Sequence, residues 1–179
     1  GEFRICPDEE GIQYKQFYWP DTNVLITRFL SPKGSAELTD FMDLPQDRGP
    51  SEVPLQLIRR LTVVSGKISF RVNCRPAFNY ARDSHTTEMS PHGVCFHHRE
   101  MSLGLATPVT LTQDGDGVIA SFDLHEGESA SFVLQVMEEG AACTLDMPEP
   151  EAERLFEETV RYWRRWISRT VDMTSSWSS

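Results

Sequence analysis

The densest group of metal-donor side chains lies in the segment His92–Glu100, which reads HGVCFHHRE. Histidine nitrogens, a cysteine thiolate and a glutamate carboxylate are suitable ligands for zinc or iron. A cupin-like metal enzyme would carry two such histidines on one face of a strand, separated by one residue. Here His97 and His98 are adjacent, so an extended strand directs them to opposite faces unless a bulge intervenes. We therefore expect no metal site, and a cupin-like metal enzyme ranks third among the functions considered.

Carboxylates are abundant, with 27 Asp and Glu residues in the chain. Paired-acid hydrolysis needs two carboxyl groups about 5–10 Å apart across a cleft, and the sequence designates no such pair. It also contains no glycine-rich phosphate loop, no GxSxG nucleophile elbow and no Cys/His constellation. The sequence therefore assigns no catalytic residue and no cofactor to this chain.

The four cysteines are widely separated and form no CxxC pair, which argues against a zinc knuckle or a redox motif. Unpaired cysteines usually behave as small buried apolar residues. We therefore expect free, buried thiols at all four positions, which are Cys6, Cys74, Cys95 and Cys143.

Two segments carry aromatic residues that could contact a sugar. In the segment RPAFNY, the residues Arg75, Asn79 and Tyr80 follow a predicted strand and could reach a sugar or the rim of a neighbouring active site. The segment Tyr14–Trp19, YKQFYW, could offer ring faces for stacking. Because side chains alternate along a strand, half of those rings must point into the core. A stand-alone carbohydrate-binding domain is therefore the second function considered.

The charge balance excludes some classes of partner. The 179 residues include 17 Lys and Arg against 27 Asp and Glu, a formal charge of −10. Such a surface repels phosphate backbones and anionic lipids, so we expect neither a nucleic-acid nor a membrane partner. No run of 18 apolar residues and no signal-peptide pattern is present, which predicts a cytoplasmic protein.

From Phe3 to about Met137, the chain shows the short alternation of half-buried antiparallel strands. The predicted turns are Ser31–Gly34, Ser65–Gly66, Asp114–Gly117 and His125–Glu128, and each is expected to join antiparallel neighbours. No crossover helices separate the runs, so two packed sheets are expected, a β-sandwich. The predicted strands are 12–19, 23–30, 36–42, 55–64, 67–74, 93–100, 101–107, 118–124 and 130–137.

The chain then changes character and predicts one amphipathic helix over Glu149–Ile167. Prolines and acids stand at its start and arginines toward its end, as the helix macrodipole favours. Its apolar stripe is too broad to leave in water, because each buried aromatic ring contributes about 2–3 kcal/mol. The stripe consists of Leu155, Phe156, Val160, Tyr162, Trp163, Trp166 and Ile167.

Four ordered blocks resemble a known family: Tyr18–Met42, Leu57–Arg82, Phe122–Leu134 and Thr159–Thr170. Together they are similar to the N-terminal non-catalytic domain of bacterial and archaeal glycoside hydrolase family 15 proteins, which are trehalase-like and glucoamylase-like enzymes. The resemblance covers nearly the whole chain. It implies a super-sandwich-like β domain at 1–145 and a helical linker at 146–179, followed by an (α/α)6 catalytic barrel that this chain lacks.

The resemblance also implies that catalysis and structural support lie in different domains. The inverting pair of glutamates would lie in the barrel, where one acid protonates the leaving oxygen and one carboxylate activates water. This chain would support that barrel without hydrolysing α-glucosides itself, although an α-glucoside could still touch its rim. The residues expected to contact the barrel are Tyr162, Trp163, Trp166 and Ile167.

Overall fold

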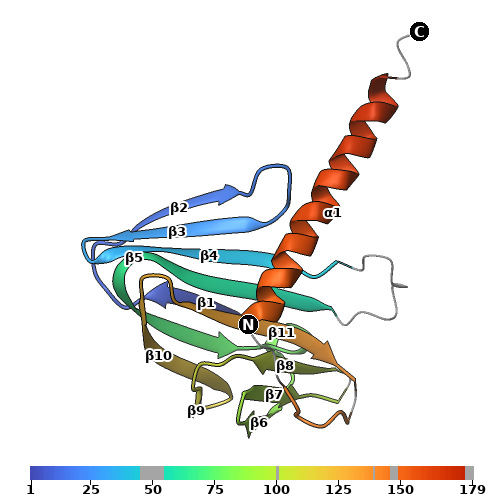
Figure 1. Ribbon diagram of the computed structural model, residues 1–179. Coiled ribbons are helices and arrows are strands. Elements are labelled where there is room, and N and C mark those ends of the chain that lie inside the picture. Colours follow the sequence, from blue (N-terminus) through green and yellow to red (C-terminus); the bar gives the residue numbers. More distant parts are fainter. Residues whose placement is uncertain (45–54, 100, 139, 146–148, 176–179) are drawn as a thin grey trace.

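The computed structural model describes residues 1–44, 55–99, 101–138, 140–145 and 149–175. This described part is mainly β-structure with one long C-terminal helix (Figure 1), which confirms the predicted fold class. The elements in chain order are β1 (Glu2–Pro7), β2 (Gln13–Tyr18), β3 (Leu25–Ser31), β4 (Gly34–Met42), β5 (Gln56–Arg75), the 3-10 turn η1 (Asn79–Ala81), β6 (Thr86–Ser90), β7 (Gly93–His97), β8 (Ser102–Ala106), β9 (Thr112–Asp114), β10 (Gly117–His125), β11 (Ser129–Met137) and α1 (Glu149–Ser175).

All strand pairs are antiparallel, and strand β5 belongs to two layers. Its first half pairs with β4 and β11 in the large layer, whose strand order is β2-β3-β4-β5-β11-β8-β7-β6. Its second half pairs with β1 and β10 in the small layer, and β10 also pairs with β9. Among the described residues, hydrogen bonds therefore join 11 strands into one continuous sheet that folds over itself, rather than into two separate sheets.

Two of the predicted hairpins are wrong, and both lie where the chain passes between layers. Ser65–Gly66 is a bend inside β5, marked by a register shift opposite Ser35 and by a left-handed φ of 77° at Gly66. A Cβ at Gly66 would collide with the carbonyl oxygen of Lys33, so only glycine fits there. The turn at His125–Glu128 joins β10 to β11, which lie in different layers and do not pair. The hairpins at Ser31–Gly34 and Asp114–Gly117 are confirmed.

The main core lies between the two layers. Phe29 of β3 meets Phe70 of β5 at 6.3 Å between ring centroids, and Phe122 of β10 meets Phe132 of β11 at 6.1 Å. Rings from opposite layers thus interlock, and each fully buried ring contributes about 2–3 kcal/mol. The core also includes Ile5, Leu38, Leu61, Val63, Ile68, Val72, Val94, Phe96, Leu105, Val118 and Leu124.

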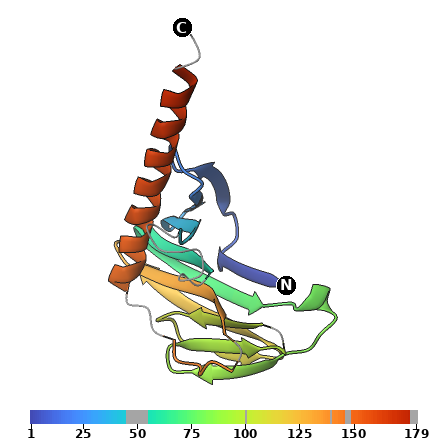
Figure 2. The same cartoon turned by 90° about the vertical axis from the view of Figure 1, so that its right-hand side faces the viewer.

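Helix α1 packs on the other face of the large layer, where a second apolar cluster joins it to the strands. Pro150 stands in its first turn, where a missing N–H is harmless. The helix was predicted to end at Ile167 but continues to Ser175, since no glycine or proline follows to stop it. Its 27 residues span about 40 Å, and its C-terminal half projects beyond the strands (Figures 1 and 2).

Candidate functional site

The first half of α1 is an anchor. Ala152, Leu155 and Val160 are buried against the large layer, and Phe156 packs edge-on against Trp19 at 5.6 Å and Phe41 at 5.8 Å. Arg60 of β5 adds an ion pair with Glu153 at 2.6 Å. This half of the helix therefore has a fixed position on the strands.

Helix α1 also carries an ion-paired arginine on its exposed side. Arg154 bridges Glu151 and Glu158 one turn to either side of it. The hydrogen bonds that Arg154 donates to Glu151, and then the one to Glu158, raise the pKa of its guanidinium above the ordinary value. Because these groups face water, the pairs contribute only a few tenths of a kcal/mol each, about what such helical pairs give.

The second half of α1 carries the four residues that the sequence singled out for contact with another domain. Tyr162, Trp163 and Ile167 are half-buried, and 52% of Trp166 is exposed. The rings of Trp163 and Trp166 meet edge-on at 5.8 Å. The indole Nε1 of Trp163 is buried, with no hydrogen-bond acceptor among the described residues. A large indole surface thus remains in water on a helix whose first half is anchored on the strands.

A groove of about 540 Å³ runs beside this part of the helix. Its apolar floor is formed by Trp19, Phe156 and Val160. Three arginines, Glu157 and Ser168 line the rest of the groove, which is therefore net basic in a molecule whose net charge is −10. The arginines are Arg161, Arg164 and Arg165. The groove therefore suits a partner that combines apolar and acidic side chains.

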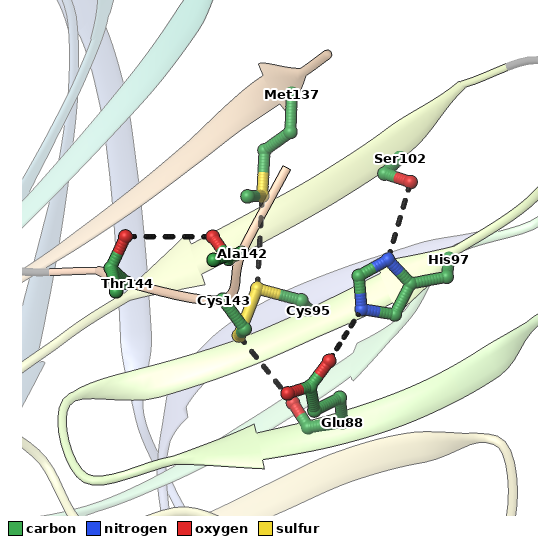
Figure 3. The surroundings of a disulfide bond; sticks show 8 residues. All are labelled: Glu88, Cys95, His97, Ser102, Met137, Ala142, Cys143 and Thr144. Carbon is green, nitrogen blue, oxygen red and sulfur yellow. Dashed lines mark hydrogen bonds and ion pairs between the residues drawn. A yellow bond between two sulfur atoms is a disulfide. The ribbon is translucent and has the colours of Figure 1, made fainter. Parts of the chain in front are cut away.

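A disulfide fixes the segment that leads into α1, and it corrects the expectation of four free thiols. Cys95 of β7 is bonded to Cys143, 48 residues later, with 5.8 Å between their Cα atoms. Met137 lies beside the bond, with its Sδ 3.7 Å from the Sγ of Cys95 (Figure 3). Cys6 and Cys74 are free. Cys95 and Cys143 are too far apart in the sequence for a local motif to indicate that they pair, so the sequence did not predict this disulfide.

His97 and His98, in the segment considered and set aside as a metal site, have separate partners. The Nε2 atom of His97 lies 2.9 Å from a carboxylate oxygen of Glu88, and that of His98 lies 3.3 Å from Asp83. Cys95 is consumed by the disulfide. Within the described ranges, no group of three or more His, Cys, Asp or Glu side chains could hold a metal ion.

Three residues were predicted as sugar contacts, and they differ in whether a ligand can reach them. Arg75 is the last residue of β5, whereas Asn79 and Tyr80 lie in the η1 turn that follows. The Arg75 guanidinium bonds to Asp114, to Asp116 at 3.5 Å, and to the side chain of Asn73 at 3.2 Å. These bonds fasten β5 to the β9–β10 turn. Arg75 therefore has a structural task, whereas Asn79 and Tyr80 are exposed.

Three consecutive residues of η1 are left-handed, with φ of 44° at Asn79, 58° at Tyr80 and 62° at Ala81. None is glycine, and this conformation costs an L-residue about 1–2 kcal/mol. The turn holds the Tyr80 side chain 93% exposed. Such strain persists only where surrounding contacts enforce it, and it concentrates at functional sites.

The contacts that enforce this turn lie on its two flanks. The Phe78 ring is buried and stacks on His98 with centroids 5.0 Å apart. Phe78 and Asp83 form a β-bridge, and the Arg82 N–H donates to the Asn79 carbonyl oxygen at 3.2 Å. The turn is thus clamped at both ends, with Tyr80 at its tip.

The second aromatic candidate, Tyr14–Trp19, lies on the edge strand β2. Tyr14 and Tyr18 are 55% and 64% exposed, but the ring of Tyr14 also packs edge-on against Phe29 at 5.5 Å. Phe17 lies under the guanidinium of Arg28 at 5.5 Å. Trp19, just after the end of β2, packs on Phe156, so three of the four rings in this segment already have protein neighbours.

No protein-family model matches the chain. Three curated relatives do, and all are trehalases. The chain is 28% identical over 173 residues to that of Thermoplasma acidophilum, covering 96% of this chain and 29% of the relative. The trehalase of Thermoplasma volcanium is 28% identical over 170 residues, covering 94% and 26% respectively. That of Mycolicibacterium smegmatis is 24% identical over 189 residues, covering 94% and 28%.

These matches confirm the resemblance to trehalase-type glycoside hydrolases. The chain spans less than a third of the length of the curated relatives it matches. A solved structure described as a kojibiose phosphorylase from the human microbiome aligns with a TM-score of 0.47 and 6% identity, over 92% of this chain and 24% of that one.

The described part of the chain contains no helix with the length and apolar composition that a membrane span requires.

Proposed function

We propose that this chain is the non-catalytic β-sandwich module of a longer trehalase-type glycoside hydrolase. The observation that carries the proposal is the asymmetry of the alignments: 96% of this chain matches only 29% of a trehalase. A match of that kind is what a module of a larger enzyme would give. Residues 1–145 form the sandwich domain, and residues 146–179 form the linker to the catalytic domain.

The catalytic partner is an (α/α)6 barrel of the same polypeptide, docked on the second half of α1. Tyr162, Trp163, Trp166 and Ile167 make the contact, together with the arginine-lined groove. The 52% exposure of Trp166 supports this arrangement, because an indole gains by being removed from water. The first half of the helix holds the interface at a fixed position on the sandwich.

The longer enzyme hydrolyses an α-glucosidic bond with inversion, and its two catalytic carboxylates lie in the barrel. We assign no catalytic residue, metal or cofactor to this chain. Trehalose is the favoured substrate, since all three curated relatives are trehalases. A glucoamylase-type enzyme acting on malto-oligosaccharides is the alternative within the same class.

Hydrolysis assays test this function directly. The purified 179-residue chain should release no glucose from trehalose or maltose, whereas a polypeptide that continues into the following domain should hydrolyse one of the two. Comparing the sugars decides between trehalase and glucoamylase types. Hydrolysis by the short chain, absent from a mock preparation, would contradict the proposal.

A stand-alone carbohydrate-binding domain remains the second candidate, because Tyr80 and Tyr18 are exposed by 93% and 64%. Calorimetric titration of the chain with trehalose and malto-oligosaccharides separates the two functions. Binding at micromolar concentration would favour an independent binding domain over a supporting module. The third candidate, a cupin-like metal enzyme, has no observation in its favour, since His97 and His98 engage different carboxylates.

The cytoplasmic location predicted from the sequence remains a proposal, and the Cys95–Cys143 disulfide bears on it. Such bonds persist in oxidising compartments and are rare in the cytosol of mesophiles. Alkylation of free thiols in intact cells, followed by mass spectrometry, would report whether the bond forms in the native compartment. A fully reduced pair would support the cytoplasm.

A further inference from the structure

The η1 turn presents one aromatic ring to solvent from a backbone segment that is held at both ends. Tyr80 is 93% exposed, more than any other large apolar or aromatic side chain in the described part of the chain. The ring stands at the tip of three left-handed residues, Asn79–Ala81, between flanks held by Phe78 and Asp83. Because the backbone of the turn is held, only the rotation of the Tyr80 side chain itself has to be restricted when a ligand binds, which lowers the entropic cost of binding.

The base of the turn is tied to the opposite hairpin. The His85 ring contacts Phe78 at 5.1 Å between centroids, and its Nε2 lies 2.8 Å from the carbonyl oxygen of Asp116. Thr87 donates to the same carbonyl oxygen at 2.9 Å. Together with the bonds from Arg75, these contacts unite η1 and the β9–β10 turn in one rigid end of the molecule.

The size of the apolar surface indicates a small ligand. One tyrosine buries about 150–250 Å², whereas a stable protein interface buries about 1,200–2,000 Å². The residues beside Tyr80 are Asn79, Ala81, Arg82 and Asp83, all exposed and mostly polar. A single ring with amide, guanidinium and carboxylate groups around it suits a polyhydroxylated ring, whose C–H face stacks and whose hydroxyls accept and donate hydrogen bonds.

We propose that Tyr80 is a stacking platform for one pyranose ring of an α-glucoside, with Asn79 and Asp83 supplying hydrogen bonds to its hydroxyls. The sugar class rests on the proposed function, but the site is independent of the α1 interface. In Figure 2 the η1 turn, drawn in green, lies on the side of the strands away from α1. A platform of one ring binds weakly, with a dissociation constant of about 1 mM or higher.

The test is an NMR titration of the 179-residue chain, labelled with ¹⁵N, with trehalose and with maltose, using glycerol as the small-polyol control. We expect saturable shifts confined to residues 75–87 and 112–117 with at least one of the two sugars. Tyr80→Ala should weaken binding about tenfold or more, and Tyr80→Phe should keep it within about twofold, because stacking uses the ring face.

Val64→Ala is the control, because Val64 is also an exposed apolar residue and lies in the middle of β5, away from η1. It should leave the titration unchanged. Absence of shifts with both sugars at high millimolar concentration would overturn the platform, as would shifts that survive Tyr80→Ala or that vanish with Val64→Ala. None of these outcomes touches the proposed function, which stands or falls with hydrolysis by the longer polypeptide.

Discussion

At the scale of single residues, the backbone strain in η1 should lower the free energy of unfolding, so a substitution that relieves it should raise that free energy. Ala81 has a φ of 62°, where glycine suffers no Cβ clash. Ala81→Gly should therefore raise the free energy of unfolding by about 1 kcal/mol, because relief of strain exceeds the added entropy of the unfolded chain. Urea unfolding monitored by fluorescence measures the change.

The matched control is Ala77→Gly, four residues earlier in the same exposed connection and outside the left-handed region. This substitution brings only the entropic cost of glycine, so it should lower stability by about 0.5–1 kcal/mol. If both substitutions destabilise the chain equally, η1 is not strained.

The buried thiol of Cys74 should make the free energy of unfolding depend on pH in the alkaline range. Burial raises the pKa of its thiol from 9.0 to about 12, and the charge of Arg59 offsets only part of that effect. Between these two pH values, the unfolded chain releases the thiol proton and the native chain retains it. The contribution of this thiol to the free energy of unfolding is therefore fully present below about pH 9, and it falls by about 1.4 kcal/mol per pH unit above that value. Cys74→Val should remove this slope, measured by urea unfolding across the range, while the slopes of other groups remain.

At the scale of elements, α1 has two halves with different tasks. Leu155 is 5% exposed in the anchoring half, so Leu155→Ala should cost about 2–4 kcal/mol of stability. Trp166→Ala, in the projecting half, should cost less than about 1 kcal/mol in the isolated chain. Urea denaturation of both variants tests the contrast. Equal losses would mean that the projecting half is already packed on the sandwich.

The disulfide is the second device that positions α1. It closes a loop with a sequence separation of 48, for which the loss of chain entropy predicts about 4 kcal/mol of stabilisation. Reductant should lower the melting temperature of the wild-type chain, and Cys143→Ala should melt low with or without reductant. Cys6→Ala serves as the control, since Cys6 is a free thiol and should not alter the response.

The sequence predicted those elements whose signal is local. Alternation revealed most strands, and the acidic start at Glu149 placed the beginning of α1 correctly. The continuity of β5 through Ser65–Gly66 was not predictable, because a glycine bend inside a strand and a hairpin turn look alike until their partners are known. The Cys95–Cys143 pairing and the left-handed turn at Asn79–Ala81 likewise depend on tertiary contacts.

At the scale of the whole molecule, the two candidate surfaces are separated. The strands place α1 on one side and η1 on the other (Figure 2). The proposed interdomain contact on α1 and the proposed platform at Tyr80 therefore share no surface. Substitutions on surfaces that share no contacts usually have additive effects, to within about 0.5 kcal/mol.

This separation predicts the behaviour of the longer polypeptide. Trp166→Ala should lower its melting temperature and leave sugar shifts at η1 unchanged, because the indole packs on Trp163 within the proposed interdomain contact and not on η1. Tyr80→Ala should do the reverse, and the double variant should show the sum of both effects. Calorimetry and NMR titration of the four proteins measure the two properties. A loss of thermal stability on Tyr80→Ala as large as that on Trp166→Ala would place η1 inside the domain contact and exclude it as an open platform.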